Sequence, residues 1–310
     1  MRLAYLTQEI FDRKNEVNTL GIEMVRTRHK YAQMEEDVKE LWRQNHMKTG
    51  MRVVIVGATG FVGRGVMKEC IESPLVEAIV TVNRSPVDYN HDKIVQKIHL
   101  PDFEQFHLLF ELKNIDACYY CAGVRPQDVP IMDYKYFTYN YSSHIAKGLY
   151  LQNQELTFCF ISHVRADESQ EIGIVWERFL GRTENALLLY YEHTYIFRLG
   201  FILPARGIMP RTRKRIRKKR MLKFFYPLFR GLFKQFYTTT ENIGKAMIQA
   251  TIDGHKEERL YSNDVDAMAD DYRNRIHRYH QNSEYHRDDD GWFRARYWDG
   301  TVVPNEKPTR

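Results

Sequence analysis

The sequence predicts an α/β fold in which a parallel sheet is doubly wound, with helices on both of its faces. Three features support this class: an apolar run at residues 51–56, a helical pattern from Phe61 to Ile71, and a second apolar run at residues 76–82. Short apolar runs that alternate with helical periodicity are typical of strand–helix–strand units, which place neighbouring strands parallel.

A glycine-rich turn joins the first predicted strand to its helix. It has the sequence Gly57-Ala58-Thr59-Gly60-Phe61-Val62-Gly63. A residue without Cβ permits a tight turn and the close approach of a pyrophosphate, and the helix N-terminus adds unpaired N–H groups. The strand, turn and helix together predict a dinucleotide site. We expect its contacts to come from Gly57, Thr59, Gly60, Phe61, Val62 and Gly63.

The second predicted strand ends in Asn83-Arg84-Ser85. At this point NAD-selective folds place an acidic residue that binds the ribose 2′-hydroxyl. Arg84 can instead pair with a 2′-phosphate, so the sequence predicts NADP(H) rather than NAD(H) as the ligand. The alternative is an arginine in a solvated loop.

These motifs, with Asp102-Phe103, the Cys121-Ala122-Gly123 turn and the segment 197–202, make residues 51–265 resemble an atypical short-chain dehydrogenase/reductase (SDR). Within that superfamily the chain is most similar to the small epimerase-like group, whose active-site and late helices are matched by residues 181–187 and 239–247. The resemblance implies a Rossmann sheet. It also implies further cofactor contacts from Asn83, Arg84, Asp102, Phe103, Cys121, Ala122, Gly123 and Ser162.

Enzymes of this family use a tyrosine as acid and base, a lysine four residues later, and a serine that orients the substrate. Here the serine is kept as Ser162, but the tyrosine and lysine positions fall on Trp176 and Leu180. An indole does not exchange protons near neutral pH and leucine carries no charge, so this resemblance implies a pseudoenzyme. The alternatives are a different alignment of the active-site helix or a substitute acid. The candidates are His163, which is favoured, Glu177 and Arg178.

Composition limits the remaining classes. No apolar stretch approaches the roughly 18 residues that span a bilayer, and 43% of the 310 residues are hydrophobic, enough for a large core. Three of the four cysteines, Cys118, Cys121 and Cys159, lie in apolar strand-like runs. They are expected to be buried thiols in a reducing intracellular compartment rather than disulfide or zinc ligands, and no metal site is expected.

Residues 1–48 carry a pattern of their own. Apolar residues recur every seven positions, namely Leu3, Ile10, Val17, Met24, Tyr31 and Val38. This seam predicts a long helix that binds a partner protein. A homodimeric coiled coil and a helix folded back on its own domain are the alternatives.

Two further segments suggest binding surfaces. Arg211-Thr212-Arg213-Lys214-Arg215-Ile216-Arg217-Lys218-Lys219-Arg220 precedes an aromatic run that extends to Tyr237, and it contributes much of the net charge of +6. The expected target is an anionic membrane surface, RNA or an acidic protein. A nuclear import signal and a solvated loop without a target are the alternatives. The polar, aromatic extension 266–310 is expected to anchor on other subunits, mainly through residues 270–310.

Taken together, the sequence predicts a non-catalytic NADP(H)-binding accessory or structural subunit of a larger, membrane-associated complex. It resembles in kind, though not in closely matched sequence, the SDR-like accessory subunit of mitochondrial complex I. By that analogy the matrix side of the mitochondrion is the expected location, with the cytoplasm as the alternative. Two other functions stay open: an NADPH-dependent oxidoreductase or epimerase with an atypical site, and a nucleotide-sensing regulatory or RNA-associated protein.

Overall fold

The computed structural model describes residues 50–85, 87, 89–100, 109, 112–210, 237–282, 285–287 and 293–295. The predicted heptad helix of residues 1–48, the basic segment 211–220 with the aromatic residues up to 236, and most of the tail beyond residue 282 lie outside the described residues. The chain divides after Lys48 into two units, and the second contains all of the described structure.

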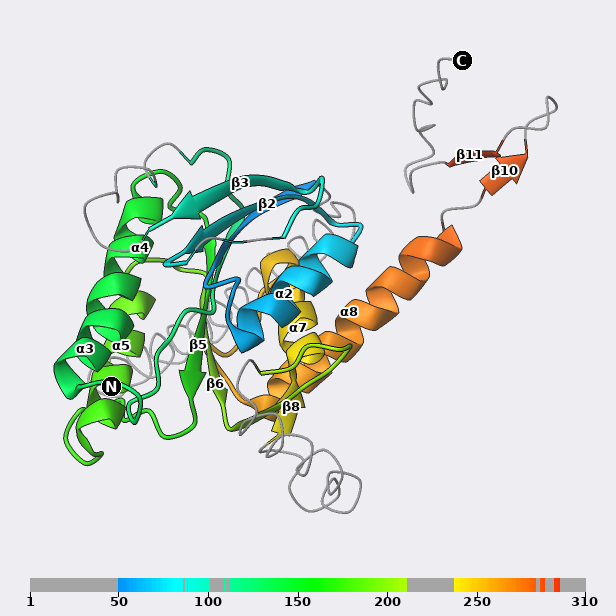
Figure 1. The fold of residues 1–310 in the computed structure, drawn as a ribbon. Helices are drawn as coiled ribbons and strands as arrows, with labels where there is room; N and C mark the ends of the chain where they lie inside the picture. Colours follow the sequence, from blue (N-terminus) through cyan, green and yellow to red (C-terminus); the bar gives the residue numbers. More distant parts are fainter. Residues whose placement is uncertain are drawn as a thin grey trace, which may run out of the picture. The chain divides into compact units, whose positions relative to one another are not determined.

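Seven described strands form one parallel sheet (Figure 1). In spatial order they are β3 (Ile94–His99), β2 (Val76–Asn83), β1 (Met51–Val56), β4 (Ala117–Tyr120), β5 (Thr157–His163), β6 (Thr194–Leu199) and β9 (Arg259–Leu260). The order reverses next to β1, so the C-terminal ends of β1 and β4 flank the point where ligands bind in doubly wound sheets. The predicted fold class is confirmed, and the first strand, helix and second strand agree with their predicted ranges to within one residue.

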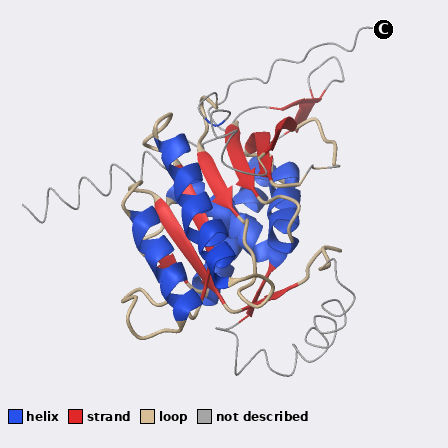
Figure 2. Ribbon diagram, turned by 60° about the vertical axis from the view of Figure 1, so that its left-hand side comes forward, coloured by secondary structure: helices blue, strands red, loops and turns tan. Residues whose placement is uncertain are grey.

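Helices cover both faces of this sheet (Figure 2). One face carries a short helix, a π-helical turn and two longer helices: α3 (Ile131–Lys135), η2 (Tyr136–Asn140), α4 (Tyr141–Tyr150) and α5 (Val175–Leu188). The other carries α2 (Phe61–Glu72), α7 (Thr240–Asp253) and α8 (Ser262–Asn282). Two small pairs complete the described structure: β7 (Phe201–Leu203) with β8 (Tyr237–Thr239), and β10 (Tyr285–Arg287) with β11 (Phe293–Ala295).

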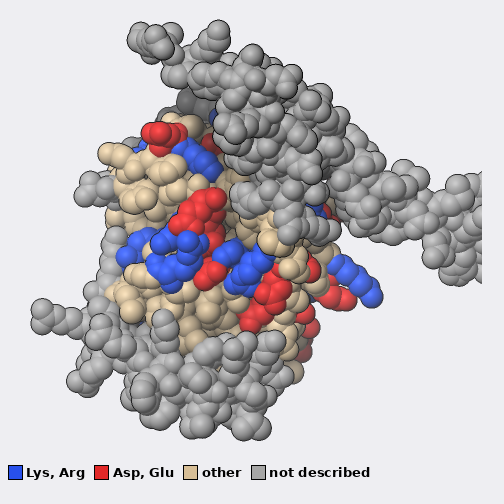
Figure 3. Space-filling model, turned by 90° about the vertical axis from the view of Figure 1, so that its right-hand side faces the viewer, with Lys and Arg blue, Asp and Glu red and all other residues tan. Residues whose placement is uncertain are grey.

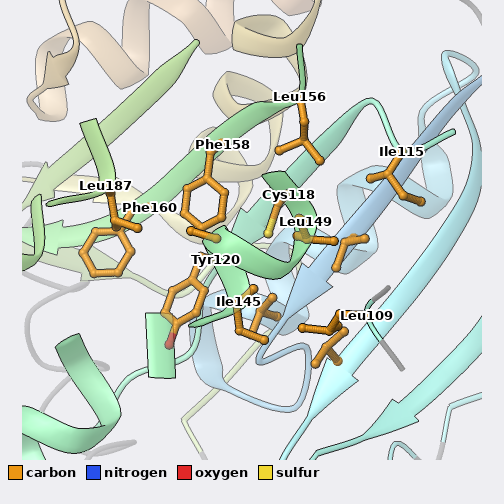
Figure 4. Close-up of a cluster of buried hydrophobic side chains, with 14 of the residues drawn as sticks. Leu109, Ile115, Cys118, Tyr120, Ile145, Leu149, Leu156, Phe158, Phe160 and Leu187 are labelled. Atoms are coloured by element: carbon orange, nitrogen blue, oxygen red, sulfur yellow. The ribbon is translucent and has the colours of Figure 1, made fainter. Parts of the chain in front are cut away.

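A large apolar cluster fills the space between the sheet and the α4–α5 layer (Figure 4). Alternate residues of β4 and β5 point into it, because side chains two apart on a strand share a face. Tyr120 stacks on Phe160 with ring centroids 5.3 Å apart, and Phe158 stacks on Tyr191 at 5.6 Å. This packing fixes the strand ends that carry the site.

On the opposite face α2 and α7 pack closely because glycine replaces a side chain at their contact. A Cβ on Gly244 would lie 2.7 Å from Cγ of Glu69. Glu69 is almost fully buried and is paired with Arg206 at 3.0 Å and with Lys245 at 3.2 Å. In the part of this side of the molecule that the described residues form in Figure 3, basic and acidic side chains lie next to one another.

The C-terminal part of the described structure begins as a helix that belongs to the sheet domain. The boundary expected after residue 265 falls inside α8, whose residues Val265, Met268, Ala269 and Tyr272 are buried. Among the described helices, none is long and apolar enough to cross a membrane.

Candidate functional site

The glycine turn lies between β1 and α2, and two of its glycines are required by the backbone. Gly57 has φ +83°, and a Cβ there would be 2.6 Å from the Ala122 backbone. A Cβ on Gly63 would lie 2.1 Å from the carbonyl oxygen of Gly57. Gly60 differs, because it is exposed, has an ordinary φ of −72° and caps α2. A side chain at Gly60 would therefore project towards a ligand rather than break the turn.

The N-terminus of α2 is suited to an anion. Gly60 offers no side chain to cap the helix, and the first turn contains no acidic residue. The partial positive charge of the helix end is therefore not neutralised within its own first turn. The loop itself is held in place by Asn83, whose Oδ1 accepts a hydrogen bond from the Thr59 amide at 3.3 Å.

Asn83 and Arg84 lie beside the glycine turn, at the end of β2. Asn83 is 3% exposed, and within the described residues its Nδ2 group has no hydrogen-bond acceptor. Arg84 is exposed, and its guanidinium Cζ lies 4.1 Å from the centre of the Phe137 ring. A buried unpaired donor and an exposed cation next to a pyrophosphate-type turn fit a dinucleotide ligand.

The Cys121-Ala122-Gly123 turn follows β4 and borders the same loop. The Cys121 amide donates to the carbonyl of Val56 at 2.9 Å. Burial raises the pKa of the Cys121 thiol well above its ordinary value, so the thiol stays protonated. All four cysteines are free thiols. The predicted adenine contacts Asp102 and Phe103 lie outside the described residues.

Ser162 lies at the end of β5, where its hydroxyl is engaged by a buried ion pair. Its Oγ donates to Oε1 of Glu184, and Arg198 Nε donates to Oε2 of the same carboxylate at 2.9 Å. Glu184 is 0% exposed and Arg198 is 6% exposed. Burial lowers the pKa of the Arg198 guanidinium. The hydrogen bonds and the negative charge of Glu184 raise it by more, so the pKa lies above its ordinary value. The described contacts of Ser162 are thus structural.

Trp176 is in the first turn of α5, beside the residue that follows Ser162. Its ring meets the His163 ring edge-on at 5.5 Å and the Tyr134 ring at 6.4 Å. Arg165 lies over it, with Cζ 5.5 Å from the ring centre. Leu180, one helical turn later, is 5% exposed and belongs to the apolar core.

His163 is held in a defined protonation state. Its Nδ1 accepts the Arg165 amide at 3.1 Å, so the neutral ring carries its proton on Nε2. Burial lowers the pKa of His163, Arg165 lowers it further, and Glu177 acts in the opposite direction. The ring is therefore neutral at physiological pH.

The other two candidate acids, Glu177 and Arg178, both lie on α5. Glu177 is paired with Arg165 and accepts the Ile174 amide at 2.9 Å through Oε2. Arg178 is half-buried on α5, and a guanidinium keeps its proton throughout the accessible pH range. Within the described residues, no group of His, Cys, Asp and Glu is arranged to hold a metal ion.

Several residues of this site were not expected from the sequence. Tyr134, Phe137, Arg165 and Glu184 contact predicted site residues, although none lies next to the glycine turn in the chain. The aromatic run at residues 134–139, which follows the Cys121-Ala122-Gly123 turn, is the one sequence signal that could have indicated two of them.

Comparison with known proteins supports the same fold. The family model described as NAD dependent epimerase/dehydratase family matches residues 53–142. Protein FMP52, mitochondrial, of Debaryomyces hansenii is 28% identical over 159 residues, which are 50% of this chain and 69% of that protein.

Two solved structures are among those similar to this chain. A thiolation-reductase di-domain from an archaeal non-ribosomal peptide synthetase has a TM-score of 0.51 at 13% identity, over 68% of this chain and 56% of that one. The ADP-L-glycero-D-manno-heptose-6-epimerase of Helicobacter pylori has a TM-score of 0.49 at 11% identity, over 73% and 83%. The strand order and the glycine turn give the described domain a Rossmann-type fold, and its residues 53–142 match the NAD dependent epimerase/dehydratase family model.

Proposed function

We propose that this chain is a non-catalytic, NADP(H)-binding accessory or structural subunit of a larger membrane-associated complex. The observation that carries the proposal is the environment of Leu180, which takes the position of the family lysine and is buried in the apolar core. An apolar side chain in that core cannot hold a ribose or lower the pKa of a neighbouring acid. Trp176, at the tyrosine position, has no exchangeable acid group either.

The contacts of the substitute acids support the same conclusion. In the neutral His163 ring, Nδ1 is occupied by a backbone amide and Nε2 already carries the proton. Such a ring can donate a hydrogen bond but neither accepts a proton at Nε2 nor carries a labile second proton at neutral pH. Glu177 is bound by Arg165 and by the Ile174 amide, and these contacts order the start of α5.

A nicotinamide dinucleotide as ligand is supported by the family match and by the fit of the glycine turn. Preference for the 2′-phosphorylated form rests on Arg84, because no acidic residue takes its place at the end of β2. When bound, the nicotinamide group supplies hydride chemistry in the family's enzymes. In this chain Gly60, Asn83 and Arg84 would hold the ligand as part of the structure.

Two observations support the proposed location and partners. The relative from Debaryomyces hansenii is described as mitochondrial, which favours the mitochondrion over the cytoplasm for this chain, and the matrix side is proposed by analogy with the complex I subunit. Residues 1–48 and 270–310 would bind other subunits and lie outside the nucleotide-binding range 51–265. The basic segment 211–220, within that range, would bind an anionic membrane surface or RNA.

A native purification tests the proposal. The tagged full-length chain is extracted in mild detergent, its particle size is measured, and both the co-purifying chains and the released nucleotide are identified by mass spectrometry. Recovery in a large particle with near-stoichiometric NADP(H) is expected. Recovery as a free monomer or homodimer would contradict the subunit role. Turnover of a carbonyl or sugar-nucleotide substrate that is lost in His163→Gln would establish the enzyme alternative instead.

A further inference from the structure

Phe137 and Arg84 form a contact that links the π-helical turn η2 to the end of β2. The Arg84 guanidinium Cζ is 4.1 Å from the centre of the Phe137 ring, well within the range of a cation–π contact. Arg84 follows β2, whereas Phe137 belongs to η2, more than fifty residues later in the chain. The contact therefore depends on the fold and is not a local feature of the loop after β2.

The Phe137 ring is held by its surroundings. It lies in a single π-helical turn between α3 and α4, a feature that often marks functional positions. The hydroxyl of Tyr120, a fully buried residue at the end of β4, donates to the Phe137 carbonyl at 3.4 Å. The Tyr136 ring meets the Phe137 ring edge-on at 5.1 Å. The aromatic surface is thus fixed before any ligand arrives.

Arg84 is restrained on its backbone but not by an acidic partner. Its carbonyl oxygen lies 2.9 Å from Nε2 of His99, and within the described residues no carboxylate pairs with its guanidinium. Stacking uses one face of a guanidinium, whereas its five N–H donors lie in the plane of the group. A stacked arginine can therefore present a pair of in-plane donors to a phosphate without losing the stack.

We propose that Phe137 is a positioning residue for Arg84, so that the stacked guanidinium is held ready to bind the 2′-phosphate of NADP(H). Discrimination between NADP(H) and NAD(H) then depends on Phe137 as well as on Arg84. This inference rests on the proposed nucleotide-binding function and adds to it a residue that the sequence motifs did not indicate.

Titration of the full-length chain with NADPH and with NADH, followed by calorimetry, tests this role. Phe137→Leu removes the aromatic face but keeps an apolar side chain, and should weaken NADPH binding by about threefold to tenfold while leaving NADH affinity unchanged. Phe137→Tyr should keep the wild-type preference. Tyr139→Leu is the matched control, because Tyr139 lies in the same turn but faces a different arginine, Arg182 at 4.9 Å.

A double-mutant cycle adds a readout that a purely structural role would not change. In an Arg84→Gln background, Phe137→Leu should have no further effect on NADPH affinity. If the wild type prefers NADPH and Phe137→Leu keeps that preference, or weakens both nucleotides equally, the positioning role is wrong and the proposed function stands. If the wild type binds neither nucleotide, the proposed function fails and this inference fails with it.

Discussion

Gly63 in the glycine turn and Gly123 in the turn after β4 differ in how closely the surrounding atoms approach them. A Cβ on Gly63 would be 2.1 Å from the Gly57 carbonyl oxygen, whereas one on Gly123 would meet nothing within 4 Å. Gly63→Ala should therefore destabilise the domain by about 1–3 kcal/mol through overpacking, even though alanine favours a helix. Gly123→Ala should change stability by less than about 0.5 kcal/mol. Urea unfolding of the two variants measures the difference, and equal midpoints would contradict the close approach at Gly63.

A second prediction at the residue scale concerns His163. Burial and the charge of Arg165 lower its pKa, so its folded-state value lies below the ordinary value of about 6.5. The stability contributed by the neutral ring is then fully present above pH 6.5 and is lost as the pH falls through the folded-state pKa. NMR titration of the ring should give a midpoint below 6.5, and Arg165→Gln should raise it.

The outcome of that titration also bears on catalysis. A midpoint near or above 7 would mean that His163 can carry a labile proton at physiological pH, which would favour the enzyme alternative. His163→Gln provides the control, because its unfolding free energy should vary less between pH 5 and 7 than that of the wild type.

At the scale of elements, the Glu184–Arg198 ion pair joins α5 to β6, and Ser162 adds β5 to the same contact. Breaking a buried pair leaves an uncompensated charge, so Glu184→Gln should cost on the order of 3–5 kcal/mol. Glu168 also pairs with Arg198, at 3.1 Å, but is 57% exposed. Glu168→Gln is therefore a matched control with an expected cost of about 0–1 kcal/mol. Thermal denaturation followed by circular dichroism compares the two, and similar losses would show that the buried pair does not dominate.

The elements that could be predicted from the sequence are those whose pattern is local. Residues 51–56 and 76–82 are short apolar runs, and the helix after Gly60 has its own periodicity, so each could be identified within its own segment. The π-helical turn η2 has no such local signal, because it lies between α3 and α4 and packs on α5, which is distant in the sequence. The role of Ser162 could not be predicted either, because its partner Glu184 lies 22 residues away and is brought to it only by the packing of α5 on β5.

At the scale of the whole molecule, the question is whether the nucleotide is a structural ligand. Gly60 is exposed and has an ordinary φ, and a Cβ there would be 3.2 Å from the Gly57 carbonyl oxygen. Gly60→Leu should therefore leave the fold in place and block the pyrophosphate, whereas Gly60→Ala should weaken binding only slightly. Nucleotide content and particle size are measured on the same purified sample. Loss of the large particle together with the nucleotide would identify a structural ligand, and an intact particle without nucleotide would exclude that role.

The last prediction separates the sheet domain from the partner-binding segment. The chain divides after Lys48 into two units, and the seven-stranded sheet lies in the second. Deletion of residues 1–48 should therefore change the melting temperature of the domain by no more than a few degrees and leave NADPH affinity unaltered, yet abolish recovery in a large particle. A variant with charged residues at Val17 and Met24 should act in the same way if the heptad seam makes the contact, because a charge at a buried seam position is not tolerated. A deletion variant that unfolds would place the segment against its own domain, and one that still assembles would assign partner binding to the other end of the chain.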